Sequence, residues 1–176
     1  MFSIQFAYLA MIAIVTSCNF LVQFPINDWL TWGSFTYPLS FLVTEVNNCL
    51  HGPRVAKRVV YVGFMLAFLL SIWLSTPKIA CASGLAFLIS QLLDISIFAS
   101  MRKRTWWFAP LFASIGASFV DTCIFWSLAF WGEPVPLMNW ALSDLSIKIL
   151  FDFVLLIPFR LAIQKATNPL RESLQA

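Results

Sequence analysis

Residues 59–74 read VVYVGFMLAFLLSIWL and contain no charged side chain. A helix that crosses the hydrocarbon core of a membrane needs about 20 mostly apolar residues, and this run supplies most of one. The rest of the 176-residue chain has the same character, because 60% of its residues are hydrophobic and only 11% are charged. Soluble proteins average about 25% charged residues. The composition therefore predicts an integral membrane protein and excludes a soluble enzyme, a large extramembrane domain and a disordered scaffold.

Other apolar runs precede and follow this one, so we predict an all-α bundle of six transmembrane helices in a single domain, 1–176. The predicted spans are residues 2–21, 36–50, 59–74, 80–101, 109–130 and 139–163. Lys78 is the only basic residue on one side of this arrangement. The other side has Arg54, Lys57, Arg58, Arg102, Lys103, Arg104, Arg160, Lys165 and Arg171. Because loops rich in Lys and Arg stay in the cytoplasm, both termini are expected to be cytoplasmic.

Charged residues also occur inside the predicted spans, where each costs about 2.5–3.5 kcal/mol at mid-bilayer. They are Glu45, Asp94, Asp121, Asp144, Lys148 and Asp152. Asp144, Lys148 and Asp152 recur at every fourth position and share one helical face, where Lys148 is a candidate for a structural ion pair with either acid. Since lipid cannot satisfy polar groups, we expect the polar stripes of all spans except 59–74 to enclose a cavity with aromatic walls.

One lysine cannot neutralise all these acids, so Glu45, Asp94 and Asp121 are expected to be protonated, exposed to water in the cavity or paired with a substrate. The presence of Lys148 inside a predicted span is explained equally well by an ion pair and by a contact with a substrate. The candidate substrate-binding residues are Asn19, Glu45, Gln91, Asp94, Asp121 and Lys148. No catalytic residue, metal ligand or cofactor is predicted, because the single histidine lies in a predicted turn and the four cysteines form no C-x-x-C pair.

Several motifs follow one another along the chain, namely CNFLVQ (18–23), WGSFTYPL (32–39), FLVTE (41–45), GPRVAKR (52–58), SQLLDISIF (90–98), WW (106–107), AP (109–110) and DT (121–122). With AFW (129–131) and the helix around Lys148 and Pro158, they resemble the queuosine precursor transporter family, also described as vitamin uptake transporters. The likeness covers nearly the whole chain. The chain departs from the family pattern at Ser90, where glycine is expected before Gln91.

This resemblance implies a multi-pass transporter of the bacterial inner membrane. It would import a queuosine precursor, 7-cyano-7-deazaguanine or alternatively its 7-aminomethyl derivative, for the synthesis of queuosine in tRNA. The resemblance also implies a six-helix fold similar to the substrate-binding subunits of energy-coupling-factor vitamin transporters, acting without a dedicated ATPase. The expected partners are the small 7-deazaguanine base and the lipid bilayer, with no nucleic acid, while a homodimer stays open.

The chemistry of the candidate residues is compatible with such a base. A deazaguanine presents an N1–H and a 2-amino group side by side, with O6 as an acceptor. One carboxylate can accept both donors, an amide can donate to O6, and aromatic walls can stack on the ring. Glu45, Asp94 and Asp121 are alternatives for the carboxylate, and Asn19 and Gln91 are alternatives for the amide.

Three other functions stand as alternatives. A vitamin-binding subunit with a partner ATPase would dock through small residues four apart on its first helix, whereas Ala7, Ala10 and Ala13 are three apart. An intramembrane hydrolase would need a nucleophile with a base, or a metal, inside the bilayer, and Lys148 is already flanked by acids. A non-transporting assembly protein would not need so many buried acids. The energy source is open between a proton gradient acting through Glu45 and facilitated diffusion.

Overall fold

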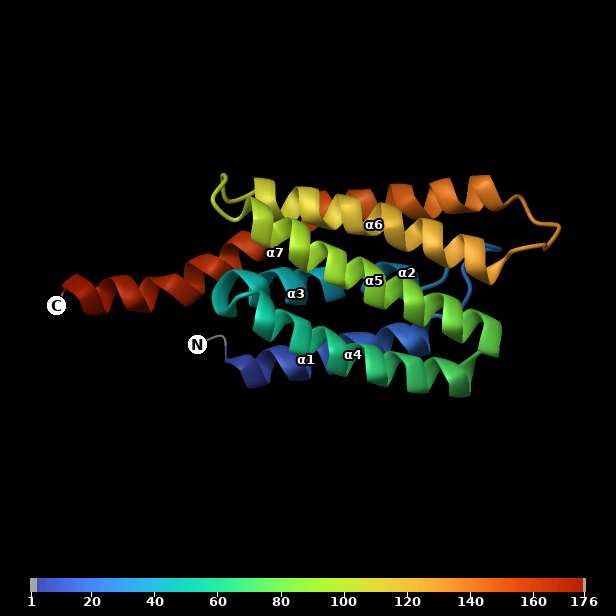
Figure 1. Ribbon diagram of the computed structural model, residues 1–176, viewed down its shortest axis with the longest axis horizontal. Coiled ribbons are helices and arrows are strands. Elements are labelled where there is room, and N and C mark those ends of the chain that lie inside the picture. The colour runs from blue at the N-terminus through green and yellow to red at the C-terminus, as the bar shows by residue number, and fades with distance from the viewer. Residues whose placement is uncertain (1–2, 176) are drawn as a thin grey trace.

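The computed structural model describes the backbone of residues 3–175 and the side chains of residues 3–167. The described chain forms α1 (Ile4–Leu21), α2 (Gly33–Thr36), α3 (Pro38–His51), α4 (Pro53–Leu74), α5 (Pro77–Met101), α6 (Phe108–Ala129) and α7 (Leu137–Gln175). Within these residues the β structure is limited to one isolated bridge between Pro25 and Thr31. The long helices run along the long axis of the molecule, and the start of α1 and the end of α7 lie at the same end (Figure 1). The predicted all-α class is confirmed.

Local sequence signals explain where the helices begin and end. Pro38, Pro53 and Pro77 each occupy the first turn of a helix, where the missing N–H of proline removes no helical hydrogen bond. Thr76 caps α5, because its side chain accepts a backbone N–H of the first turn at 3.3 Å. Gly52 separates α3 from α4 with a φ of 85°, which glycine adopts without steric cost.

Two helices extend beyond the apolar runs that predicted them. Helix α4 begins at Pro53, so Arg54, Lys57 and Arg58 lie in its first two turns and not in a separate basic loop. Helix α7 continues to Gln175, past the predicted end of the span at residue 163. Each added residue of an existing helix gains one backbone hydrogen bond whatever its hydropathy. Hydropathy therefore locates the apolar part of a helix but not its ends.

Within the described residues, α1, α4, α5 and α6 are long and apolar enough to cross a membrane. Helix α3 has 14 residues, about 21 Å of helix, which is shorter than the roughly 30 Å hydrocarbon core. Helix α7 is long, but Asp144, Lys148 and Asp152 interrupt its apolar sequence. The chain is a multi-pass membrane protein, and the count of six spans stays a prediction.

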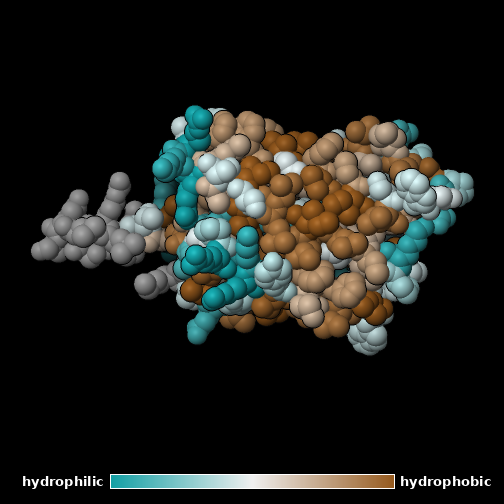
Figure 2. All heavy atoms as spheres, viewed as in Figure 1, coloured by the Kyte–Doolittle hydropathy of each residue, from teal (hydrophilic) through white to brown (hydrophobic). Residues whose placement is uncertain are grey.

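The surface has an apolar band between two polar ends. Figure 2 shows hydrophobic residues over the middle of the visible face, with hydrophilic residues gathered at both ends and most densely at the end that holds the termini. Met65, Leu69, Phe119 and Leu150 are each more than half exposed. Soluble monomers rarely expose so large an apolar surface, whereas lipid solvates it. The α3–α4 and α5–α6 connections lie at the end with the termini (Figure 1).

Candidate functional site

Lys148 of α7 lies between two carboxylates in the interior of the bundle. Its Nζ is 2.8 Å from Oδ2 of Asp121 on α6 and 2.6 Å from Oδ2 of Asp144, one turn earlier on α7. It also donates to Oγ1 of Thr122 at 3.1 Å. All three charged side chains are at least nine-tenths buried as residues. The expectation that Asp121 lacks a cation is wrong, because Lys148 reaches it from the neighbouring helix.

Further hydrogen bonds hold the two acids in place from several helices. Oδ1 of Asp121 accepts the hydroxyl of Tyr37 at 2.6 Å and that of Ser90 at 3.2 Å. Oδ2 of Asp144 accepts the indole N–H of Trp126 at 3.2 Å. Charge-assisted bonds of this kind are stronger than neutral ones. Together they connect Tyr37, which lies between α2 and α3, with α5, α6 and α7. We call these side chains, with Lys148 and Thr122, the outer cluster.

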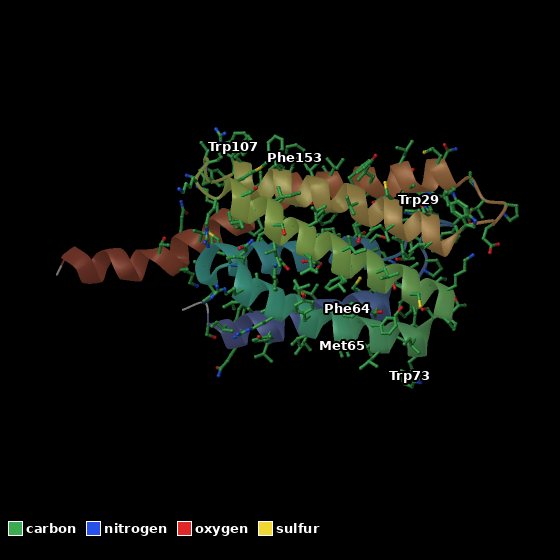
Figure 3. The ribbon with its side chains drawn as sticks, viewed as in Figure 1. Trp29, Phe64, Met65, Trp73, Trp107 and Phe153 are labelled. Atoms are coloured by element: carbon green, nitrogen blue, oxygen red, sulfur yellow. The ribbon has the colours of Figure 1, made fainter. Side chains whose placement is uncertain are left out.

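A cavity of about 340 Å³ lies against the outer cluster. Its lining includes Cys18, Asn19, Asp28, Trp29, Tyr37, Phe87, Asp121, Phe125, Trp126, Phe130, Asp144 and Lys148. Trp126 and Phe130 stack with ring centroids 5.0 Å apart and build an aromatic wall. Figure 3 shows Trp29 at the end of the bundle opposite Trp107, so the cavity belongs to the end remote from the α5–α6 connection. Its volume falls in the range of sites for small molecules.

The predicted site residues form two groups in the structure, and Gln91 belongs to neither of them. Asn19, Asp121 and Lys148 line the cavity, as does Asp144, for which only an ion pair was predicted. Gln91 is outside the lining, and its amide is committed to the contact between α3 and α5. Its Oε1 accepts from Thr44 at 2.6 Å and its Nε2 donates to Ser40 at 2.8 Å. Gln91 therefore acts as a link between helices.

The other group is a set of buried acids deeper in the bundle, Glu45 on α3, Asp94 on α5 and Asp152 on α7, which we call the inner acids. They are 5%, 0% and 4% exposed and lie close enough to repel one another. Three of their carboxylate oxygens have no hydrogen-bond partner among the described residues. They are both oxygens of Asp94 and Oε1 of Glu45. Asp152 was a predicted partner of Lys148, but it accepts from Ser118 at 3.2 Å instead. No described cation pairs with the inner acids.

Sequence reasoning missed Tyr37 and Trp126 as members of the site. Trp126 follows Thr122 by four residues, which places both on one face of α6. Both side chains donate to Asp144 of α7, a contact between helices that spacing within α6 does not predict. Tyr37 lies directly before Pro38 in a stretch that was expected to be the start of a span. Nothing in its spacing indicates a contact with a residue 84 positions later.

Comparisons with known proteins agree on one kind of protein. Residues 31–76 and 71–163 match the family model described as Putative vitamin uptake transporter. The chain is 30% identical over 174 residues to the Queuosine precursor transporter of Escherichia coli (strain K12), covering 82% of this chain and 79% of the relative. It is 28% identical over 188 residues to the Probable queuosine precursor transporter of Haemophilus influenzae, covering 84% and 80%. No solved structure matches the chain.

Proposed function

Since the chain belongs to the family of vitamin uptake transporters that includes queuosine precursor transporters, we propose that it is an inner-membrane importer of a queuosine precursor. The proposed cargo is 7-cyano-7-deazaguanine, with the 7-aminomethyl derivative as the alternative, and the proposed use is modification of tRNA. The relatives are named as transporters and not as enzymes. The choice of a deazaguanine cargo is supported by the chemistry of the cavity at the outer cluster.

The observation that carries this proposal is that one cavity combines a carboxylate, an amide and aromatic walls. All hydrogen bonds of Asp144 use Oδ2, so Oδ1 is left to accept the N1–H and 2-amino donors of the base. Asn19 donates one amide hydrogen to the backbone oxygen of Val15 at 3.0 Å and has a second for O6. Trp126 offers a ring face for stacking. Asp121 is less suited, because both its oxygens are already used.

The same proposal includes six spans with the cavity facing outwards. Helices α2 and α3 adjoin at Tyr37 and together form the second span, and α7 forms the sixth. The predicted basic groups lie on α4, on the α5–α6 connection and on α7, at the end of the bundle with the termini. The positive-inside rule puts that end in the cytoplasm, so that the cavity faces the medium from which an importer takes its cargo.

Reporter fusions test this orientation. Fusions after Arg58, Arg104 and Ala176 are expected to report a cytoplasmic position, and fusions near Asp28, Thr76 and Glu133 an external one. The six-span arrangement has one crossing, α6, between Arg104 and Glu133. A cytoplasmic signal at Glu133 would contradict it, because both residues would then lie on the same side of the membrane.

The importer is proposed to act without a partner ATPase. A docking face of small residues on α1 would have to be on the outside of the bundle. Ala7 is fully buried and packs with Met11, Val59 and Val60, so this position of α1 is used against α4, whereas Ala10 is half-buried and Ala13 is exposed. Leu9, on the outward side, is 67% exposed and suits contact with lipid.

Restoration of queuosine in tRNA tests the function. In cells that cannot make the precursor, expression of this chain with supplied 7-cyano-7-deazaguanine is expected to restore queuosine. Asp144→Asn is expected to prevent restoration, whereas Glu133→Gln, a matched change at an exposed loop residue, should leave it intact. A parent chain that reaches the membrane and restores nothing would refute the proposal.

A further inference from the structure

A second cavity, of about 290 Å³, lies at the opposite end of the bundle from the first. The α5–α6 connection and the later part of α7 border it, and the end of α3 closes one side. Arg102, Arg104 and Arg160 line it, and no Asp or Glu is among its described lining residues. It is therefore a cationic cavity, separate from the outer cluster.

Two of the three arginines are held towards this cavity by specific contacts. The guanidinium of Arg102 donates to the backbone oxygens of Asn48 and Cys49 at the end of α3, the latter at 2.6 Å. Arg160 stacks over the ring of Trp106, with its guanidinium carbon 4.4 Å from the ring centroid. Arg104 forms no ion pair with any described residue, and neither do the other two. Three guanidinium charges thus line one cavity without a counter-charge among the side chains of residues 3–167.

The floor of the same cavity is apolar. Phe98 and Phe159 are 2% and 3% exposed and pack edge to face, with ring centroids 6.1 Å apart, beside the buried Ala109. Trp106 and Trp107 on the connection above are 46% and 40% exposed, and Figure 3 shows Trp107 at this end of the bundle. Exposed tryptophans mark the level of the membrane–water interface. The cavity therefore lies where hydrocarbon meets water.

We propose that this cavity binds the phosphate-bearing headgroup of an anionic phospholipid. Guanidinium groups bind phosphate oxygens through paired hydrogen bonds, and basic pockets between transmembrane helices on the cytoplasmic side suit anionic headgroups. The phenylalanine floor would cover the glycerol and the first acyl carbons. Free phosphate carries at least as much negative charge but gains nothing from that floor, so the lipid is favoured.

Occupation of this site would hold three parts of the fold together, the α5–α6 connection, α7 and the end of α3. Purified full-length chain in neutral detergent is therefore expected to melt at a higher temperature with phosphatidylglycerol than with phosphatidylcholine. The expected shift is about 5–10 °C at a lipid concentration some 100 times the dissociation constant. Inorganic phosphate at the same concentration is expected to give no shift, and a full shift with phosphate alone would overturn the lipid assignment.

Arginine variants test the location. Arg104→Gln combined with Arg160→Gln is expected to weaken the phosphatidylglycerol effect at least tenfold in lipid concentration. Lys57→Gln combined with Arg58→Gln removes the same charge from exposed positions on α4 outside the cavity and should retain the effect. Equal losses in both double variants would overturn a specific site in favour of general charge attraction.

The single variant Arg104→Gln provides a second measurement in case the loss of the Trp106 contact disturbs folding. It should melt normally in phosphatidylcholine and bind phosphatidylglycerol more weakly, and unchanged lipid binding would overturn the site. All these measurements use protein without a transported base. Failure of lipid binding is therefore distinguishable from failure of the proposed import.

Discussion

Replacing Lys148 by methionine tests whether the outer cluster is held by charge. Removal of one partner from a buried ion pair costs about 3–5 kcal/mol, and here the lysine serves two carboxylates at 2.8 and 2.6 Å. Lys148→Met is therefore expected to lower the free energy of unfolding by about 5 kcal/mol. Asp121→Asn leaves the pair between Lys148 and Asp144 in place. It is therefore expected to lower the free energy of unfolding only by the cost of imperfect hydrogen bonds, about 1–3 kcal/mol.

The measurement is unfolding in mixed detergent micelles, followed by tryptophan fluorescence. Lys78→Met is the matched control, because it removes a lysine whose pair with Glu133 is about half exposed, and such pairs contribute about 1 kcal/mol or less. If Lys148→Met is no less stable than Asp121→Asn, the charge argument is wrong.

Two further predictions concern binding and energy coupling. Asp144→Asn is expected to weaken binding of 7-cyano-7-deazaguanine to the purified chain by about 2–5 kcal/mol. Asp94→Asn, outside the cavity, should leave binding unchanged. Equal losses of affinity in both variants would remove Asp144 from the proposed site. In liposomes without tRNA, an acidic exterior is expected to drive accumulation of the base, and Glu45→Gln should abolish that accumulation while leaving equilibration. Equilibration without accumulation in the parent chain would indicate facilitated diffusion.

The helices were predictable because their signals are local. Apolar runs identified the long helices, and Pro38 and Pro77 start helices within three residues of the predicted spans. Helix α4 begins six residues before the predicted span, because Arg54 and its basic neighbours continue the helix beyond its apolar part. A helix tolerates charged residues at an end that leaves the membrane, so hydropathy has no information about that boundary.

The pairing of the buried charges was only partly predictable. The contact between Lys148 and Asp144 follows from helical spacing alone and is present in the structure. The contact with Asp121 depends on how α6 and α7 pack, and Asp152 was an equally good candidate by spacing. Asp144 and Asp152 each lie one turn of α7 from Lys148, so spacing does not distinguish them, and the packing of α7 against its neighbours decides which acids the lysine meets. A single sequence does not contain that packing.

The contrast between the two sets of buried acids indicates how a transport cycle would divide its tasks. In the outer cluster Lys148 is bonded to both acids, so the cluster can remain charged while a base binds beside it. Glu45 and Asp94 have no cationic partner within the described part of the chain and have unpaired oxygens. Charging all the inner acids together in a low-dielectric interior is prohibitively costly. Asp94 is two turns along α5 from Phe87 of the cavity lining, about 10 Å further in. In the proposed cycle, a base would be recognised at the outer cluster, where the charges are paired. It would then pass next to the inner acids, where binding and release of a proton could be coupled to movement of the base.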